Sequence, residues 1–431
     1  MVKVITYGTF DYLHHGHIRL LERAKALGDY LIVGVTADDF DKTRGKINVR
    51  QSLMERVEAV RATGLADEII IEEYEGQKID DIRKYDIDIF TVGSDWEGRF
   101  DYLRDYCRVV YLERTEGISS SDIRDEKRHL RLGIVGNSAF LNKICSESRF
   151  VNGIDVTGVC TDNIDILDIK PANFPYEELI ENVDAVYIRS LPNVHYEQIV
   201  YAIEHGKHVL CESPVCLSAS QTGKLYELAK NKGVCLMTAL KTAYATAYNR
   251  LLLLIKSGII GKVVSVDATC TSLCNSGTDW PGIFEWGPTA LLPVFQILGT
   301  DYIKKDVIAH FIDNKDSFTK MDFVYRNAVA SIKVGDGVKS EGELIISGTT
   351  GYIYVPAPWW KTDYFEVRYE NPSDNRRFFY QLDGEGIRYE LVAFVQSIEN
   401  GKPASSLDEN ISIAISQVMQ DYTDKDNITI I

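Results

Sequence analysis

The sequence has no excess of positive charge, no paired-cysteine motif and no long apolar run. Its formal net charge is −16, so it lacks the basic face that a nucleic acid or an anionic membrane surface requires. Its eight cysteines are scattered without a CxxC pair, which predicts reduced, mostly buried thiols. No apolar run approaches a membrane span, and the N-terminus lacks the form of a signal peptide. We therefore expect a cytoplasmic protein that binds no nucleic acid and does not insert into a membrane.

The length of the chain indicates more than one domain. At 431 residues it is too long for one ordinary hydrophobic core, so two or three domains are expected. Hydrophobic content of 45% and charged content of 26% are ordinary for a globular protein. Because the chain is acidic, a phosphate site within it must be locally basic, with its histidine, lysine and arginine residues gathered in motifs.

Residues 4–25, VITYGTFDYLHHGHIRLLERAK, form the most informative stretch. An alternating apolar run predicts a strand, a turn follows, and apolar positions at helical spacing predict a helix. Unpaired N–H groups and the helix dipole favour an anion at such a helix start. His14 and His17 lie on one side of it, where both imidazoles can donate to one phosphate, and Gly16 keeps that space open. The stretch therefore predicts a phosphate site.

Strand-like and helix-like segments alternate over residues 1–128. This alternation predicts a doubly wound parallel sheet, in which ligands bind at the carboxyl ends of the strands. Three polar loops, at 8–17, 93–96 and 114–121, follow expected strands and therefore lie at such ends. The expected strands are 4–7, 30–36, 68–72, 87–92 and 109–112, and the expected helices are 18–27, 51–62 and 79–85.

These loops also resemble a known family. The runs GTFDYLHHGHIRLLERAK, VGSDWEGRFD and RTEGISSSDI are similar to those of the glycerol-3-phosphate cytidylyltransferases, in the HxGH nucleotidyltransferase superfamily. The resemblance implies transfer of a cytidylyl group from CTP to a polyol phosphate, with glycerol 3-phosphate as the leading acceptor and pyrophosphate as the second product. It also implies Mg²⁺ on the CTP phosphates without dedicated protein ligands, a homodimer, and a role in teichoic-acid-type or capsular polysaccharide synthesis.

The chemistry of nucleotidyl transfer suggests roles for the residues of these motifs. The acceptor phosphate must be aligned with the α-phosphorus of CTP, and charge must be stabilised as pyrophosphate departs. We expect His14, His17, Lys46 and Arg114 to do this as the catalytic residues, whereas His15 is a packing or surface residue. The expected CTP-binding residues are Thr9, Phe10, Asp11, Gly16, Gly93, Asp95, Thr115, Gly117, Ile118, Ser119 and Ser120.

Some of these expectations are more specific. Thr9 and Phe10 offer backbone N–H groups, and Asp95 is placed to hold the ribose hydroxyls. Asp11 orients the histidines or meets the metal. The serines at 119–121 precede an expected helix at 122–127, so they are candidates for an N-cap and a second anion site.

One stretch departs from the family pattern. Family members carry RYVDE after the helix at 51–62, whereas residues 64–68 of this chain read GLADE. A guanidinium near the acceptor phosphate is therefore missing, and we expect Arg56 or Arg61 to replace it. The acceptor stays open among the phosphates of glycerol, ribitol, arabinitol, erythritol and mannitol.

The second half of the chain begins another α/β fold after the charged stretch 122–131. The runs DAVYI, EHGKHVLCESP, GIIGKVVSV, GTTG and YELVAFVQSIENG resemble those of the Gfo/Idh/MocA oxidoreductase family. Period-2 segments at 263–269 and 323–334 predict an antiparallel sheet. We therefore expect two doubly wound, Rossmann-like domains at 1–128 and 129–250 and an α+β domain with a largely antiparallel sheet at 251–431. Other expected elements are strands 132–135, 185–188 and 208–211 and helices 196–204 and 222–231.

The dinucleotide signatures of this second fold are incomplete. Of the G-x-G-x-x-G glycines only Gly136 is present, with Ser138 and Leu141 at the other two places. The Glu-Lys-Pro run of the family reads Glu-Ser-Pro from Glu212. The degenerate dinucleotide site thus comprises Gly136, Ser138 and Glu212, and the usual Asp-then-His helix is not visible at 290–299.

Two hypotheses remain for the second half. It is either an active NAD(P)-dependent reductase that supplies the polyol phosphate, or a scaffold with little use for the cofactor that serves oligomerisation or substrate retention. The incomplete glycine motif, the missing lysine and the missing Asp-then-His helix together favour the scaffold. For the whole chain, a non-catalytic nucleotide sensor is disfavoured, because a sensor needs no alignment of an acceptor.

Overall fold

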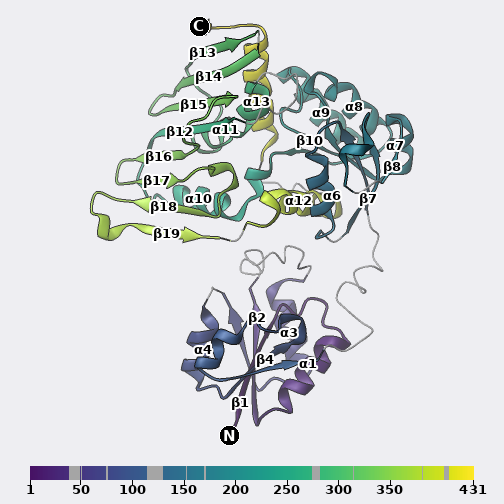
Figure 1. Cartoon of the computed structure of the whole chain (residues 1–431), viewed down its shortest axis with the longest axis vertical. Helices are drawn as coiled ribbons and strands as arrows, with labels where there is room; N and C mark the ends of the chain where they lie inside the picture. The colour runs from purple at the N-terminus through teal and green to yellow at the C-terminus, as the bar shows by residue number, and fades with distance from the viewer. Residues whose placement is uncertain are drawn as a thin grey trace. The chain divides into compact units, whose positions relative to one another are not determined.

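The chain folds as two compact units, Met1–His129 and Leu130–Ile431, which we name the first and second units (Figure 1). The computed structural model describes residues 1–37, 49, 51–73, 76–113, 130–151, 153–168, 171–273, 282–313, 315–380, 382–401 and 407–431. Within these residues, no helix is both long enough and apolar enough to cross a bilayer. The cysteines among them are free thiols.

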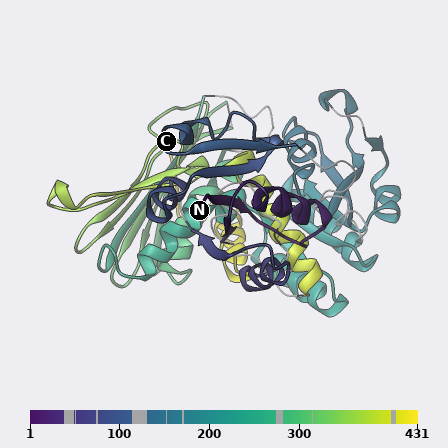
Figure 2. The ribbon, with the colours of Figure 1, turned by 90° about the horizontal axis from the view of Figure 1, so that it is seen from below.

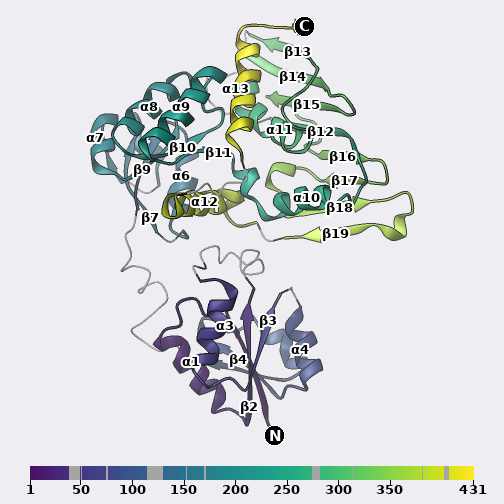
Figure 3. The same cartoon turned by 180° about the vertical axis from the view of Figure 1, so that it is seen from behind.

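The first unit is a five-stranded parallel sheet in the order β3-β2-β1-β4-β5, with helices on both faces (Figure 3). The strand order reverses between β1 and β4, so the loops after these two strands meet at a topological switch point, where open α/β sheets bind ligands. The elements are β1 (Lys3–Gly8), α1 (His15–Lys25), β2 (Tyr30–Thr36), α3 (Leu53–Ala62), β3 (Glu68–Glu72), α4 (Gln77–Tyr85), β4 (Ile89–Gly93), η1 (Ser94–Trp96), η2 (Asp101–Asp105) and β5 (Arg108–Leu112).

The helices of the first unit cover its sheet because their apolar stripes are buried against it. Leu21 of α1 and Val57 and Val60 of α3 pack on one face of the sheet. Ile82 of α4 and Leu103 of η2 pack on the other face. The inner strands β1, β2 and β4 are largely apolar on both faces, as parallel strands covered on both sides must be.

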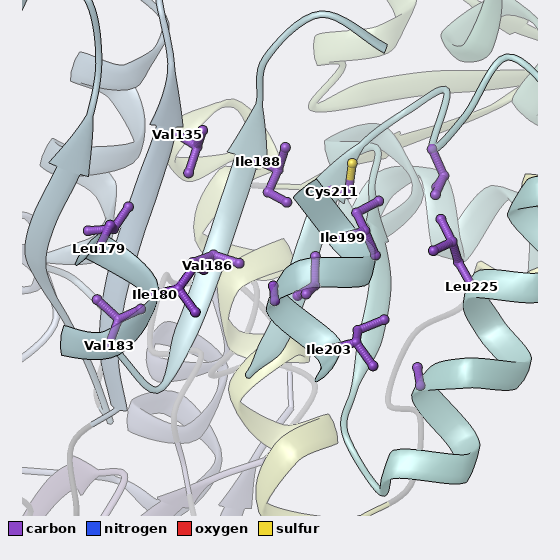
Figure 4. Close-up of a cluster of buried hydrophobic side chains, with 14 of the residues drawn as sticks. Val135, Leu179, Ile180, Val183, Val186, Ile188, Ile199, Ile203, Cys211 and Leu225 are labelled. Atoms are coloured by element: carbon purple, nitrogen blue, oxygen red, sulfur yellow. The ribbon is translucent and has the colours of Figure 1, made fainter. Parts of the chain in front are cut away.

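The second unit contains a six-stranded parallel sheet in the order β11-β10-β9-β6-β7-β8. Here too the order reverses, between β6 and β9, and the last residues of these strands, Gly136 and Arg189, are register partners. Figure 4 shows apolar side chains, Ile199 and Leu225 among them, packed between this sheet and its helices. The elements are β6 (Leu130–Gly136), α6 (Leu141–Ser148), β7 (Ile154–Cys160), η3 (Ile164–Ile166), β8 (Ala172–Asn173), α7 (Tyr176–Asn182), β9 (Ala185–Arg189), α8 (Pro192–Glu204), β10 (His208–Glu212), α9 (Ala219–Lys232) and β11 (Leu236–Ala239).

The same unit contains a nine-stranded sheet in the order β19-β18-β17-β16-β12-β15-β14-β13-β20, whose strands from β19 to β13 are labelled in Figure 1. Figure 2 shows the ribbon from below. Two neighbouring pairs, β12 with β15 and β13 with β20, run parallel, and the other described neighbours run antiparallel. Helix α13 packs on both α9 and α11, between the two sheets (Figures 1 and 3). The elements are η4 (Lys241–Tyr244), α10 (Thr246–Lys256), β12 (Val263–Ser272), α11 (Gly282–Leu298), β13 (Lys304–Ile312), β14 (Lys315–Val324), β15 (Val329–Asp336), β16 (Leu344–Gly348), β17 (Tyr352–Val355), η5 (Trp359–Lys361), β18 (Tyr364–Arg368), η6 (Pro372–Asp374), β19 (Arg376–Phe379), η7 (Asp383–Gly386), α12 (Ile387–Asn400), α13 (Glu409–Thr423) and β20 (Ile428–Ile430).

The predicted fold class is confirmed: two parallel, Rossmann-like sheets and a largely antiparallel third sheet. Residues 323–334, expected as a period-2 segment of an antiparallel sheet, belong to two strands that pair antiparallel. β14 ends at Val324 and β15 begins at Val329, and in the tight turn between them Tyr325 N–H donates to Ala328 O at 2.9 Å. Both strands alternate buried and more exposed residues, but the buried positions are odd-numbered up to Tyr325 and even-numbered from Ala330, so the alternation changes phase at the turn.

Candidate active site

The two motif histidines lie together at the N-terminus of α1. His14 is the N-cap, and its Nδ1 accepts a hydrogen bond from the backbone N–H of Gly16 at 3.1 Å. The His14 and His17 rings are stacked with their centroids 3.9 Å apart. His15, between them, is exposed. A hydrogen bond to Nδ1 leaves Nε2 of His14 as its donor. The helix start therefore presents two adjacent imidazoles where an anion is favoured.

The buried side chain of Phe10 supports the turn before α1. Phe10 has a positive φ of 54°, and its side chain is buried. A Cβ at Gly8 would lie 2.9 Å from the Phe10 ring, so glycine is needed where β1 passes over it. The ring also meets His17 edge-on, with 5.4 Å between centroids. Phe10 thus fixes the turn and one of the two histidines at the same time.

Arg56 holds the same turn from helix α3. Its side chain is fully buried, and Nη1 donates to Thr9 O at 2.7 Å and to Thr36 O at 2.8 Å. Nε donates to Gln51 O at 3.2 Å. The guanidinium therefore ties the end of β2 and the segment before α3 to the turn before α1. Contact of Arg56 with an acceptor phosphate stays a prediction, and the hydrogen bonds of the described residues give it a positioning role.

Arg61, the other expected acceptor residue, lies on the surface. Its side chain is 59% exposed and pairs with Glu58 one turn earlier on α3. Asp11 is buried in the turn, where its Oδ1 accepts from the backbone N–H of Gln51 at 3.1 Å. The Gln51 side chain in turn accepts from Tyr12 N–H at 2.7 Å. Two hydrogen bonds thus join the turn to the segment before α3.

The loop after β4 lies beside the turn, because β1 and β4 are neighbours in the sheet. β4 ends at Gly93, and Asp95 lies in the short helix η1. A Cβ at Gly93 would meet no described atom within 4 Å, so packing among these residues does not explain the glycine. The remaining expected site residues, namely Lys46, Arg114, Thr115, Gly117, Ile118, Ser119 and Ser120, lie outside the described residues.

A buried polar network under this edge of the sheet was not predicted from the sequence. Thr36 Oγ1 donates to Glu72 at 2.9 Å, and Lys78 pairs with the same carboxylate. Lys78 Nζ also lies 4.6 Å from the centroid of the Tyr7 ring, and the Tyr7 hydroxyl donates to Asp81 at 2.8 Å. Burial, with the nearby Asp81, raises the pKa of Tyr7, so the phenol stays protonated. The network ties the carboxyl ends of β2 and β3 to α4.

The second unit has a cavity of about 420 Å³ at its own switch point, between β6 and β9. Gly136, Ser138 and Glu212 all line this cavity, so the three expected residues lie together. Gly136 has a φ of 150°, and a Cβ there would lie 2.6 Å from Arg189 O, which accounts for this glycine. Asp162 also lines the cavity, just after β7, and accepts from Asn137 Nδ2 at 2.6 Å.

Charged side chains from distant segments meet in this cavity. Arg189 Nη2 donates to Glu285 Oε1 of α11 at 2.8 Å, and the guanidinium lies 4.7 Å from the centroid of the Phe140 ring. Burial lowers the pKa of Arg189, but the carboxylates of Glu212 and Glu285 outweigh it and raise that pKa. Burial raises the pKa of Glu212. Sequence reasoning missed Arg189 because only the sheet register places it beside Gly136.

His195 fixes one wall of the cavity. Its ring is buried, with Nε2 2.9 Å from Ser190 O and Nδ1 3.1 Å from Pro214 O. Burial lowers the pKa of His195 to about 4, so the ring is neutral near pH 7. The neutral ring carries one N–H, so it donates to only one of these carbonyls while it lies between the loops after β9 and β10.

Comparison with known proteins agrees with the division of the chain into a first and a second unit. A family model described as cytidylyltransferase-like matches residues 5–126. The glycerol-3-phosphate cytidylyltransferase of Bacillus spizizenii is 50% identical over 130 residues, which are 30% of this chain and 100% of that protein. A model of the oxidoreductase family, NAD-binding Rossmann fold, matches residues 138–240.

Relatives of the second unit are more distant. The NADP-dependent scyllo-inositol 2-dehydrogenase of Bacillus subtilis is 44% identical over 68 residues, which cover 16% of this chain and 21% of that protein. The crystal structure of a 3-ketoreductase from Actinomadura kijaniata, with NADP and TDP-benzene, has a TM-score of 0.62 at 17% identity and covers 70% of this chain and 99% of its own. That likeness shows the fold. The chain is therefore a nucleotidyltransferase of the cytidylyltransferase-like family, fused to a second unit with the fold of the NAD-binding oxidoreductase family.

Proposed function

We propose that the first unit transfers the cytidylyl group of CTP to glycerol 3-phosphate, forming CDP-glycerol and pyrophosphate. The observation that carries the proposal is the stacked His14–His17 pair at the start of α1, at the switch point of the sheet. It is supported by 50% identity to a glycerol-3-phosphate cytidylyltransferase over the whole length of that relative. The two imidazoles suit a triphosphate because both can donate to its oxygens as charge develops.

The reaction needs no covalent intermediate on the protein. An oxygen of the acceptor phosphate attacks the α-phosphorus of CTP, and the bond from that phosphorus to the bridging oxygen of the β-phosphate breaks. The electron pair leaves with pyrophosphate, whose charge His14 and His17 stabilise. Phe10 and Arg56 keep the turn rigid, so these donors are aligned before the substrates bind. Lys46 and Arg114 are proposed to close over the same phosphates.

Mg²⁺ is proposed to accompany CTP. The described residues hold no cluster of three histidine, cysteine or acidic side chains suited to a metal. Mg²⁺ is usually held by one or two carboxylates together with substrate phosphates, which suits a turn containing the single carboxylate of Asp11. When bound, the ion neutralises charge on the departing pyrophosphate. We further propose cytoplasmic CDP-glycerol synthesis by a homodimer, for teichoic-acid-type or capsular polymers.

The histidine assignment is tested by comparing His17→Ala with His15→Ala. Loss of one preorganised donor should lower kcat for CDP-glycerol formation by about 10²-fold or more. His15→Ala is the matched control, because His15 is exposed on the same helix turn and donates nothing to the proposed site. Equal rates for the two variants would contradict the assignment. A parallel screen of glycerol, ribitol, arabinitol, erythritol and mannitol phosphates identifies the acceptor.

A second candidate function is NAD(P) binding by the second unit, favoured by the cavity at the switch point between β6 and β9. Gly136 and Asp162 suit the turn and the ribose of a dinucleotide. Ser138 and Leu141 stand in place of two glycines and do not suit the pyrophosphate of a dinucleotide. Ser213 replaces the expected lysine. The fit is partial, so no hydride-transfer step follows from it. Titration with NADPH, followed by nicotinamide fluorescence, tests the proposal: saturation supports it, and a linear response contradicts it.

A further inference from the structure

A continuous chain of buried contacts joins Lys78, in the first turn of α4, to the turn before α1. Lys78 pairs with Glu72 at the end of β3, and Thr36 Oγ1, at the end of β2, donates to the other oxygen of that carboxylate at 2.9 Å. Thr36 O in turn accepts from Arg56 Nη1 at 2.8 Å, and the same nitrogen donates to Thr9 O at 2.7 Å. Four residues thus link helix α4 to the turn that leads into the two motif histidines.

The residues of this chain of contacts are buried, so a partner that is removed is not simply replaced by water. Their exposed fractions are 7%, 1%, 2% and 0% for Lys78, Glu72, Thr36 and Arg56. Desolvation offsets much of the attraction within a buried ion pair, whereas removal of one partner leaves an uncompensated charge. The Lys78–Glu72 pair therefore contributes more to a fixed geometry than to net stability.

Lys78 also contacts the strand that leads directly into the turn. Its Nζ lies 4.6 Å from the centroid of the Tyr7 ring, and Tyr7 precedes Gly8, the last residue of β1. The Tyr7 hydroxyl donates at 2.8 Å to Asp81, which lies three residues after Lys78 on α4. The first turn of α4 therefore contacts the end of β1 directly and the end of β2 through Glu72.

We propose that Lys78 is a positioning residue for cytidylyl transfer, acting through Glu72 and Arg56 on the turn before α1. The inference rests on the proposed function of the first unit and adds to it a residue that touches neither substrate. Held in this way, the turn keeps the rings of His14 and His17 stacked, with 3.9 Å between centroids, before CTP binds. A misplacement of about 1 Å in such a site lowers the rate by as much as about 10²-fold.

The first test compares variants of the full chain in CDP-glycerol formation. Lys78→Met leaves the buried Glu72 carboxylate without its cation, so kcat should fall by about tenfold or more, with KM for CTP and for glycerol 3-phosphate changed by less than about twofold. Ile82→Ala is the matched control, because Ile82 is buried on the same helix and packs on the same face of the sheet. It loses packing and should leave kcat of the folded chain unchanged.

Two outcomes of these assays would overturn the proposal. One is an equal fall in kcat in Lys78→Met and Ile82→Ala, with the folded fraction of each measured by near-ultraviolet circular dichroism. The other is a higher KM for glycerol 3-phosphate in Lys78→Met without a fall in kcat, which would make Lys78 a contact of the acceptor.

A double-mutant cycle tests whether Lys78 acts through Glu72. Glu72→Gln removes the charge and keeps an oxygen that accepts from Thr36 Oγ1. In this background Lys78→Met should lower kcat by less than about threefold, because no carboxylate is left without a cation. Equal losses of kcat in the two backgrounds would contradict the route through Glu72.

Nuclear magnetic resonance of the histidine rings measures the geometry of the turn independently of activity. In the full chain with isotope-labelled histidine, Lys78→Met should shift the ring signals of the stacked His14 and His17 and leave that of the exposed His15 in place. Unchanged signals of His14 and His17 would overturn the proposal. Failure of the unmodified chain to form CDP-glycerol would count against the proposed function alone, because the ring signals still report on the turn.

Discussion

Replacing Arg56 by methionine should destabilise the first unit, because three backbone carbonyls lose their donor. These are Thr9 O, Thr36 O and Gln51 O, at 2.7, 2.8 and 3.2 Å from the guanidinium nitrogens. Each buried acceptor left unsatisfied costs about 1–3 kcal/mol. Thr36 is buried, whereas Thr9 and Gln51 are half-buried, so water relieves part of their loss. We expect a total near 3 kcal/mol.

Hydrogen exchange of amides in β1 and β2 measures this change in the intact chain. A loss of 3 kcal/mol should speed exchange through unfolding of the first unit on the order of a hundredfold. Arg61→Met is the control on the same helix, because its exposed ion pair with Glu58 should change stability by less than about 0.5 kcal/mol. Equal effects of the two variants would refute the reasoning. A higher KM for glycerol 3-phosphate in Arg56→Met, with stability unchanged, would instead support contact with the acceptor.

Two further predictions concern the second unit. Because burial lowers the pKa of His195 to about 4, the unfolded chain takes up that proton first as the pH falls. The free energy of unfolding should therefore decline from pH 6.5 toward pH 4, by up to about 3 kcal/mol. Denaturant unfolding measures this pH dependence, and His195→Asn should make it weaker. The same pH dependence in the variant would contradict the prediction. Gly136→Ala should destabilise the unit by more than about 1 kcal/mol, because its Cβ would lie 2.6 Å from Arg189 O. Gly223→Ala in α9 is the control and should leave the stability unchanged, because its Cβ would meet only Ile413, at 3.9 Å, among the described atoms. Equal melting temperatures for the two variants would contradict the prediction.

Local patterns predicted most elements of the first unit. The strands expected at 30–36 and 68–72 coincide with β2 and β3. β2 is buried and reads as a continuous apolar run, as a covered parallel strand does. The helix expected at 18–27 begins earlier, at His15, because the His14 side chain caps it. The helix expected at 51–62 begins at Leu53, after a capping box between Ser52 and Glu55 that sequence reasoning overlooked.

The arrangement at the start of α1 was predictable because its motif is local: His14, Gly16 and His17 follow one another, so their position at the helix start could be read directly. Gly136 and Glu212, far apart in the chain, were expected together because of the family resemblance, and both line one cavity.

The roles of Arg56 and Arg189 could not be predicted, because each depends on atoms that only the fold brings near. Arg56 meets the carbonyl of Thr9 on another element, and Arg189 meets Glu285 far along the chain.

The most direct test of the central claim is product analysis of the full chain with CTP, Mg²⁺ and glycerol 3-phosphate. Chromatography should show one CDP-glycerol for each pyrophosphate released, and no pyrophosphate when the acceptor is left out. Release of pyrophosphate at the same rate without any acceptor, or no consumption of CTP with any polyol phosphate, would contradict the claim that the first unit is a polyol-phosphate cytidylyltransferase.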